Sequence, residues 1–341
     1  MYKSEASFIN GKFLYYAFIA GGIQILQNQA EINRINIFPV NDKDTGTNLA
    51  STIRSVIDNI KPHKSYKTTV NNIADAALMG ARGNSGVIFA QFLYGLSRET
   101  LSKPIVTLPE FAESLKKSIP YMYEAIANPV EGTMLTVIKE WSDFIYSKKE
   151  AIRDFENVII DSYAVLEKSL RETTLKLSPL NKSGFVDAGA KGFVLFIKGI
   201  IDFIKNRNIR NLEVDSQENI SIIHSEELTS EEIIHRYCTE AIIKNVIISK
   251  RDLQNILCES GDSVVIAGSK NVCRIHLHTN NPAELFHRLN DLGTISFQKV
   301  EDMIRQQEAA IKRKWNIALV TDSTCDLSQE LIDFYQINVV P

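Results

Sequence analysis

Apolar side chains in the first two hundred positions recur at the spacing of α-helices. Two sets show this spacing most clearly: Ile53, Val56, Ile57 and Ile60, and Ile159, Tyr163, Leu166 and Leu170. Each set lies on one helical face, and strand-like alternation is nearly absent here. We therefore predict an all-α domain over residues 1–205. Its eight helices are expected near 10–30, 45–60, 69–79, 85–98, 109–127, 133–148, 154–176 and 187–205.

The pattern changes after this domain. Residues 206–232 are rich in Asn, Asp and Glu and weakly periodic, which predicts a linker. Residues 233–300 then alternate between strand-like and helical stretches in the order β-α-β-β-α-β, which indicates a split-βαβ middle domain. The stretches are Tyr237–Ile243, Lys250–Glu259, Ser263–Ala267, Val272–Thr279, Pro282–Leu292 and Thr294–Val300.

The last part of the chain predicts a connecting helix over 301–314 and a short α/β unit over 315–341. This unit has an apolar strand at Trp315–Thr321, a helix at Leu327–Tyr335 and a second strand at Ile337–Val340. Parallel strands need cover on both faces, and one helix covers only one face. We therefore expect the incomplete start of a domain; a terminal βαβ cap on the middle domain is the alternative.

Composition excludes several classes of protein. The 341 residues carry 38 Lys and Arg against 41 Asp and Glu, so no basic excess exists to bind nucleic acid. The N-terminus lacks the apolar core of a secretory signal, and Gly192–Ile204 is too short and too charged to span a bilayer. Four cysteines in so long a chain do not make a disulfide framework. The expectation is a soluble, cytoplasmic protein.

An acidic loop precedes the helix expected at 45–60. Within Asn36–Asn48, Asp42 and Asp44 lie two positions apart. Carboxylates are preferred ligands of Mg²⁺, and the N–H groups that begin a helix bind anions. The loop therefore indicates a metal site beside a phosphate site, although an Asp-rich turn that only caps the helix explains it equally well.

A glycine loop, Gly80–Gly86, joins two predicted helices. Its three glycines allow main-chain N–H groups to approach a ligand closely. The spacing and the lysine of a Walker loop are missing, so a tight turn between helices is the competing interpretation.

Four motifs in order resemble the bacterial fatty acid kinase family, whose first domain is similar to the ATP-binding subunit of dihydroxyacetone kinases. Asn36–Asn48 resembles N-x-F-P-V-P-D-G-D-T-G-T-N, and Gly80–Ile88 matches G-A-R-G-N-S-G-V-I. Glu131–Leu135 matches E-G-T-M-L, and Ser183–Gly189 resembles S-G-x-V-D-A-G. The resemblance covers most of residues 10–205 and implies an eight-helix barrel with ATP and Mg²⁺ at one end.

The resemblance also implies roles for individual residues. Asp42 and Asp44 would be the catalytic Mg²⁺ ligands, with Asn36 as a further metal-linked residue. The nucleotide would be bound by Thr47, Asn48, Gly83, Asn84, Ser85, Gly86, Thr133, Met134 and Asp187. Two positions depart from the family pattern. Asn41 replaces Pro, and Lys43 replaces a Gly, although Lys tolerates a positive φ poorly. Lys43 would therefore either reach a phosphate or weaken the metal site.

A Cys and two His form a third candidate site. In Val272–Thr279, strand alternation places Arg274, His276 and His278 on one face. In a split-βαβ sheet the first strand lies beside the third, which brings Cys238 near the pair. This set suits zinc, although two exposed histidines and a half-buried thiol are the plainer interpretation because zinc usually takes four ligands. The family resemblance, through Tyr237–Glu240 and His276–Asn280, implies zinc.

The C-terminal segment Ile317–Leu327 looks like the opening of a DegV-type fatty-acid-binding domain. The resemblance therefore implies an ATP-dependent kinase that phosphorylates a fatty-acid carboxylate, presented by a DegV-type domain or protein. A polyol kinase of the dihydroxyacetone type and a non-catalytic, lipid-linked module with a degenerate ATP site are the alternatives. Homodimerisation and transient contact with a membrane surface are left open.

Overall fold

The computed structural model describes residues 8–39, 41–150, 154–206, 233–310 and 313–340. Within residues 8–206, its helical region, eight longer helices match the eight predicted ones. They are α1 (Gly11–Gln27), α3 (Thr45–Asn59), α4 (Tyr66–Gly80), α5 (Gly83–Glu99), α6 (Leu108–Tyr123), α7 (Met134–Lys148), α8 (Phe155–Lys176) and α10 (Ala188–Asn206). Four short elements were not predicted: α2 (Gln29–Arg34), α9 (Ser178–Ser183) and the paired strands β1 (Phe8–Asn10) and β2 (Ile105–Thr107).

The helical region is held together by the apolar faces that the sequence pattern predicted. Ile53 and Val56 of α3 and Leu166 of α8 are buried in one continuous core. Aromatic rings from α5, α7 and α10 pack edge to face at its centre; Phe193, for example, contacts Trp141 with ring centroids 5.5 Å apart. The Trp141 indole donates a hydrogen bond of 2.8 Å to Ser162, so its polar atom is satisfied inside the core.

The middle domain has the predicted β-α-β-β-α-β order. Its elements are β3 (Tyr237–Lys244), α11 (Lys250–Ser260), β4 (Asp262–Gly268), β5 (Val272–Thr279), α12 (Pro282–Leu292) and β6 (Thr294–Asp302). The antiparallel sheet has the strand order β4-β5-β3-β6, which confirms that the first strand lies beside the third. The predicted linker falls, apart from Asn206, on residues 207–232, which lie outside the described residues.

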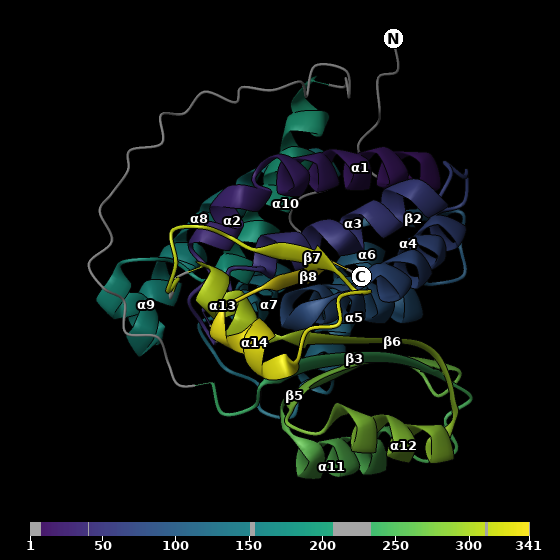
Figure 1. Cartoon of the computed structure of the whole chain (residues 1–341). Helices are drawn as coiled ribbons and strands as arrows, with labels where there is room; N and C mark the ends of the chain where they lie inside the picture. The colour runs from purple at the N-terminus through teal and green to yellow at the C-terminus, as the bar shows by residue number, and fades with distance from the viewer. Residues whose placement is uncertain (1–7, 40, 151–153, 207–232, 311–312, 341) are drawn as a thin grey trace.

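Both faces of this sheet are covered. One face packs its apolar residues, including Ile275 and Leu277, against α11 and α12. The other face lies against the helical region (Figure 1), where Val265 and Ala267 of β4 join the helical core. Main-chain hydrogen bonds connect the two domains, including one of 2.8 Å from Ile266 N–H to the Ala125 carbonyl. The two domains therefore share an extensive interface.

The C-terminal part differs in detail from the prediction. The charged helix expected at 301–314 is α13 (Met303–Ala310), because Glu301 and Asp302 still pair with β3 and extend β6. The expected strand Trp315–Thr321 is reduced to β7 (Val320–Asp322). It is followed by α14 (Gln329–Phe334) and β8 (Asn338–Val340), and β8 pairs with β7 in parallel.

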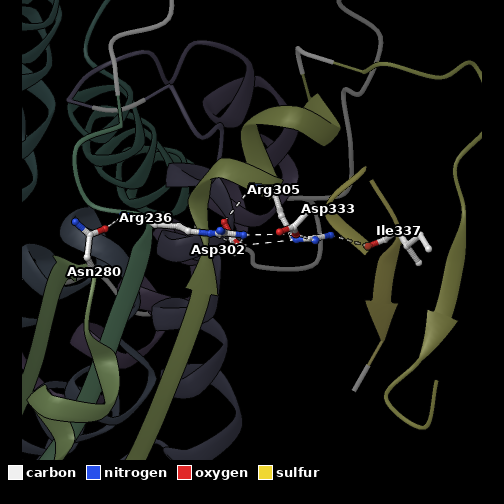
Figure 2. Close-up of polar contacts among 6 residues, drawn as sticks. All are labelled: Arg236, Asn280, Asp302, Arg305, Asp333 and Ile337. Atoms are coloured by element: carbon white, nitrogen blue, oxygen red, sulfur yellow. Dashed lines mark hydrogen bonds and ion pairs between the residues drawn. The ribbon is translucent and has the colours of Figure 1, made fainter. Parts of the chain in front are cut away.

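The C-terminal unit is joined to the middle domain largely by ion pairs (Figure 2). Arg236, which precedes β3, lies 2.6 Å from a carboxylate oxygen of Asp302 and 3.6 Å from one of Asp333 in α14. Arg305 of α13 pairs with Asp333 and donates a hydrogen bond of 2.8 Å to the Ile337 carbonyl. Exposed ion pairs contribute little stability singly, so this junction is held less firmly than the interface of the sheet with the helices.

Candidate active site

The acidic loop lies at the edge of a small polar cavity where the two domains meet. Asp42 and Asp44 both line this cavity, which has a volume of about 40 Å³. Asn36 donates a hydrogen bond of 2.7 Å to Asp42 Oδ1 and accepts one from the Thr45 hydroxyl. The Asn36 amide therefore orients Asp42 and the first residue of α3, and its role as a metal-linked residue stays a prediction.

The two aspartates form a half-buried pair of like charges. Burial, together with the charge of Asp44, raises the pKa of Asp42 well above its usual range. Burial also raises the pKa of Asp44. Like charges held together away from water are costly unless a cation neutralises them, and carboxylate oxygens suit a hard divalent cation. The donor set therefore fits Mg²⁺ held by Asp42 and Asp44.

Lys43, between the aspartates, has a φ of 56°, the left-handed conformation that Gly adopts more readily. Holding a residue with a side chain there costs roughly 1–2 kcal/mol. Lys43 lies outside the residues that line the polar cavity, so the structure gives no support to a contact of its ammonium group with phosphate. Both aspartates nevertheless line the cavity with Lys43 between them.

The glycine loop forms a second wall of the same cavity. Gly83 begins α5 with a φ of +55°, and a Cβ on it would lie 2.1 Å from Asn48 Nδ2. No side chain fits there without displacing Asn48, whose amide also lines the cavity. Asn84 and Ser85 line it too, as the resemblance implied.

Two of the residues expected to contact phosphate lie elsewhere. The Thr47 hydroxyl accepts hydrogen bonds of 3.1 Å from Gln29 and 3.0 Å from Asn33, because its position in α3 turns it toward α2. Gly86 N–H is bonded within α5 to the Arg82 carbonyl. A Cβ on Gly86 would lie 2.7 Å from the Thr52 hydroxyl, so this glycine allows α5 to pack closely on α3. Neither residue lines the polar cavity or the larger cavity that adjoins it, and their contact with phosphate stays a prediction.

A larger cavity of about 340 Å³ adjoins the polar one, and the two share five lining residues: Phe38, Pro39, Thr45, Asn84 and Ser85. Thr133, Met134 and Asp187 line the larger cavity, and their contact with a nucleotide stays a prediction. Val264 and Val265 of the middle domain contribute part of its wall. The N-termini of α3, α5, α7 and α10 all begin at or beside the residues that line the two cavities, which makes the region attractive to anions.

Asp187 connects two of these helix N-termini. Its Oδ1 atom accepts hydrogen bonds of 3.0 Å from Met134 N–H, at the start of α7, and 2.8 Å from Ala190 N–H, in the first turn of α10. Burial nevertheless raises the pKa of Asp187 to about 6. The carboxylate thus organises this end of the nucleotide pocket at a cost in stability when it is ionised.

An Asp187→Asn variant should separate the capping of the two helices from the cost of ionising a buried carboxyl group. Because the pKa of Asp187 in the folded protein is about 6, above the ordinary value of 3.8, the stabilisation by the protonated form is lost as the pH rises through 6. The Asn variant keeps the accepting oxygen and should match the parent at about pH 4, then exceed its stability by up to about 3 kcal/mol near neutral pH. Thermal unfolding at several pH values measures the difference.

The matched control is Asp187→Ala, which removes both helix caps. It should be less stable than the Asn variant at every pH, by about 1 kcal/mol for each lost cap. If the difference between the Asn variant and the parent is independent of pH, Asp187 is ionised without penalty and the assignment is wrong.

The third wall of the polar cavity comes from the middle domain. Cys238, His276 and His278 have ligand atoms that all lie within 4.8 Å of one another, and all three side chains are buried. This overturns the interpretation of two exposed histidines, because the sheet face that carries them is covered by the helical region. The Cys238 sulfur lies 3.8 Å from His276 Nδ1, and His276 Nε2 is buried without a hydrogen-bond partner.

Cys238, His276 and His278 form a Cys–His cluster, and a carboxylate lies close to each of its two histidine rings. Glu240 lies 3.6 Å from His276 Nδ1, and Asp262 lies 3.5 Å from His278 Nδ1. Carboxylate partners of this kind orient histidines that bind metal. Burial raises the pKa of the Cys238 thiol, and a bound cation would favour its thiolate. One thiol and two imidazoles are a donor set that suits zinc.

Comparison with known proteins identifies both domains. Residues 39–202 match the DAK2 domain, and residues 234–310 match the FakA-like middle domain of fatty acid kinase. The chain joins a DAK2 domain to a FakA-like middle domain. The polar cavity lies where these two domains meet.

Several relatives contain both regions. An uncharacterized protein of Staphylococcus saprophyticus is 30% identical over 318 residues, which cover 90% of this chain and 57% of the relative. One from Staphylococcus aureus is 29% identical over 322 residues, covering 91% and 58%. The chain thus spans little more than half the length of these relatives. The solved dihydroxyacetone kinase from C. freundii, in complex with AMP-PNP and Mg²⁺, aligns with 14% identity and a TM-score of 0.44 over 59% of this chain and 36% of that chain.

Sequence reasoning missed the residues that connect the DAK2 domain to the middle domain. Glu240 lies two positions after Cys238, on the same face of β3, and pairs across the sheet with His276. The predicted strand order already placed the strand that carries Glu240 beside the strand that carries His276. What the sequence lacked was any sign that this face of the sheet is buried by a second domain.

Among the described residues, no helix is long and apolar enough to cross a membrane.

Proposed function

We propose that the protein transfers the γ-phosphoryl group of ATP to the carboxylate of a fatty acid that a DegV-type domain or protein presents. One observation carries the proposal: the aspartate pair, the glycine loop and the Cys–His cluster line a single cavity. That cavity opens beside a larger one with room for a nucleotide. An anionic donor and a carboxylate acceptor both need positive charge and donated hydrogen bonds. Helix N-termini at these walls offer N–H donors, and the aspartate pair and the Cys–His cluster would hold the cations.

In the proposed reaction, an oxygen of the acceptor carboxylate forms a bond to the γ-phosphorus. The bond from that phosphorus to the β–γ bridging oxygen breaks, and ADP leaves with the electron pair. The acceptor is already ionised, so no strong general base is needed. The chain's contribution is to position the two reactants and to stabilise the transferring group.

The base and ribose are assigned to the larger cavity, beside Met134 and Val264. The phosphates would extend toward Asn84 and Ser85, where α5 presents main-chain N–H groups. Asp42 and Asp44 would hold Mg²⁺, which when bound neutralises phosphate oxygens. Asn36 would keep the Asp42 carboxylate turned toward the cavity.

Cys238, His276 and His278 would hold zinc on the opposite wall, where the ion would supply a positive centre for the acceptor carboxylate. The match of residues 234–310 to a fatty acid kinase middle domain supports a fatty acid over a polyol as acceptor. The parallel strands of the C-terminal unit agree with a DegV-like opening, which remains part of the proposal. The placement of both aspartates in the cavity argues against a degenerate ATP site.

An acceptor screen tests the proposal. The chain is incubated with ATP, Mg²⁺ and either a DegV-type protein loaded with fatty acid or free dihydroxyacetone, and acyl phosphate is trapped with hydroxylamine. We expect hydroxamate to form only with the loaded carrier. Faster turnover with dihydroxyacetone would support the polyol alternative, and absence of ATP turnover with every acceptor would support the non-catalytic one.

A further inference from the structure

A buried ion pair in the middle domain lies directly over the glycine loop of the DAK2 domain. Glu240 of β3 and Arg274 of β5 are almost fully inaccessible to solvent, and their charged atoms lie 2.7 Å apart. Both side chains point out of the sheet toward the helical region, on the same face as the Cys–His cluster. A buried pair of this kind gives little net stability. A contribution to stability therefore does not explain why the pair occupies this position.

The pair contacts both ends of the turn between α4 and α5. Glu240 Oε1 accepts a hydrogen bond of 2.6 Å from Gly83 N–H, the first residue of α5. The Arg274 guanidinium lies 3.5 Å from the carbonyl of Met79, in the last turn of α4. The anion thus faces the positive end of one helix dipole and the cation faces the negative end of the other. Each charge matches the helix end that it meets.

The Glu240–Arg274 pair is fixed by several contacts. The Glu240 carboxylate lies 2.7 Å from the Arg274 guanidinium and accepts a hydrogen bond of 2.6 Å from Gly83 N–H. Arg274 also lies over the Phe297 ring, 4.6 Å from its centroid, which orients the guanidinium plane. Both side chains are therefore firmly placed in the folded protein.

Gly83 links this contact to the cavity. It has a positive φ and no room for a Cβ beside Asn48, and in this conformation its N–H points at Glu240. The next two residues, Asn84 and Ser85, line the polar cavity. A change in the orientation of Gly83 would therefore turn the groups that follow it away from the cavity.

We infer that the Glu240–Arg274 pair is a positioning device by which the middle domain holds the DAK2 glycine loop in its phosphate-binding conformation. The phosphate-binding part of this inference rests on the proposed function; the holding of the loop does not. Since Glu240 also lies beside His276, the same carboxylate sets the distance between the glycine loop and the Cys–His cluster.

Hydrogen exchange at the Gly83 amide tests the holding directly and needs no catalysis. Glu240→Ala should speed exchange of this amide at least tenfold, whereas Glu240→Gln, whose amide oxygen can still accept the hydrogen bond, should restore most of the protection. Because Glu240→Ala leaves Arg274 buried without its partner, a Glu240→Leu/Arg274→Met variant is tested in parallel. It removes both charges together and should fold with a Gly83 amide that exchanges as fast as in Glu240→Ala.

The matched control is Asp302→Asn, which breaks an arginine–carboxylate pair of the same domain that faces the C-terminal unit. It should leave both Gly83 exchange and the Kd for Mg²⁺·AMP-PNP unchanged. The Leu/Met variant should raise that Kd and the KM for ATP at least tenfold. Unchanged Gly83 exchange in the folded Leu/Met variant overturns the inference. Fast exchange with an unchanged Kd overturns its phosphate-binding part. If the parent shows no ATP turnover but the exchange pattern holds, the proposed function fails and the loop contact stands.

Discussion

An Asp42→Asn/Asp44→Asn double variant is expected to lose ATP-dependent phosphoryl transfer by at least about a thousandfold, the scale of losing one preorganised transition-state-stabilising group. Both carboxylates line the polar cavity, and they are the acidic side chains among its lining residues. Asparagine preserves their shape and removes the charge that would hold Mg²⁺. The measurement is the initial rate of acyl phosphate formation with the parent and the variant at equal concentration.

Thermal unfolding of the parent and the double variant serves as the control for correct folding. The variant removes two half-buried like charges, so without metal its Tm should equal or exceed that of the parent. Mg²⁺·AMP-PNP should raise the Tm of the parent, because a ligand that binds only the folded state stabilises it, and should leave the Tm of the variant unchanged. A well-folded double variant that keeps full turnover would remove the aspartates from the mechanism.

Loss of the Cys–His cluster is expected to have the second-largest effect. Cys238→Ser and His276→Gln should each lower acyl phosphate formation at least about a hundredfold, because changes at or around a metal site commonly cost one to two orders of magnitude or more. The Kd for Mg²⁺·AMP-PNP should change little, since the larger cavity lacks both side chains. Bound zinc, measured on the purified protein, should fall in parallel with activity.

Cys258→Ser is the matched control for the thiol. Cys258 is an exposed free cysteine on α11, on the other side of the sheet from the cluster. Its replacement should change neither zinc content nor turnover. Full activity and unchanged zinc in Cys238→Ser would show that the cluster is not part of the site, whatever its proximity to the aspartates.

The sequence was informative wherever periodicity and local motifs determine structure. The spacing of Ile53, Val56 and Ile60 predicted α3 because a helix with one apolar face has few other ways to bury it. Alternation in Val272–Thr279 likewise predicted β5 and grouped His276 with His278. These features depend on neighbours within a few residues, so one sequence suffices to find them.

Features that depend on the contact between domains could not be predicted in this way. The face of β5 that carries Arg274 and His276 has the polar residues of a solvent-exposed surface, yet it is buried by the helical region. The hydrogen bond between Gly83 and Glu240 joins residues 157 positions apart, and no local pattern signals it. The packing of Thr47 against α2 and of Gly86 against Thr52 was likewise beyond a local pattern, because a motif names the residues of a loop but not their tertiary contacts.

A crystal of the protein with Mn²⁺ and AMP-PNP would test the central claim most directly. Manganese replaces Mg²⁺ at carboxylate sites and is located by its anomalous scattering. We predict a manganese peak bound by Asp42 and Asp44, with the nucleotide phosphates beside Asn84 and Ser85 and the Cys–His cluster on the facing wall. A nucleotide bound elsewhere, with no manganese at the two aspartates, would contradict the account.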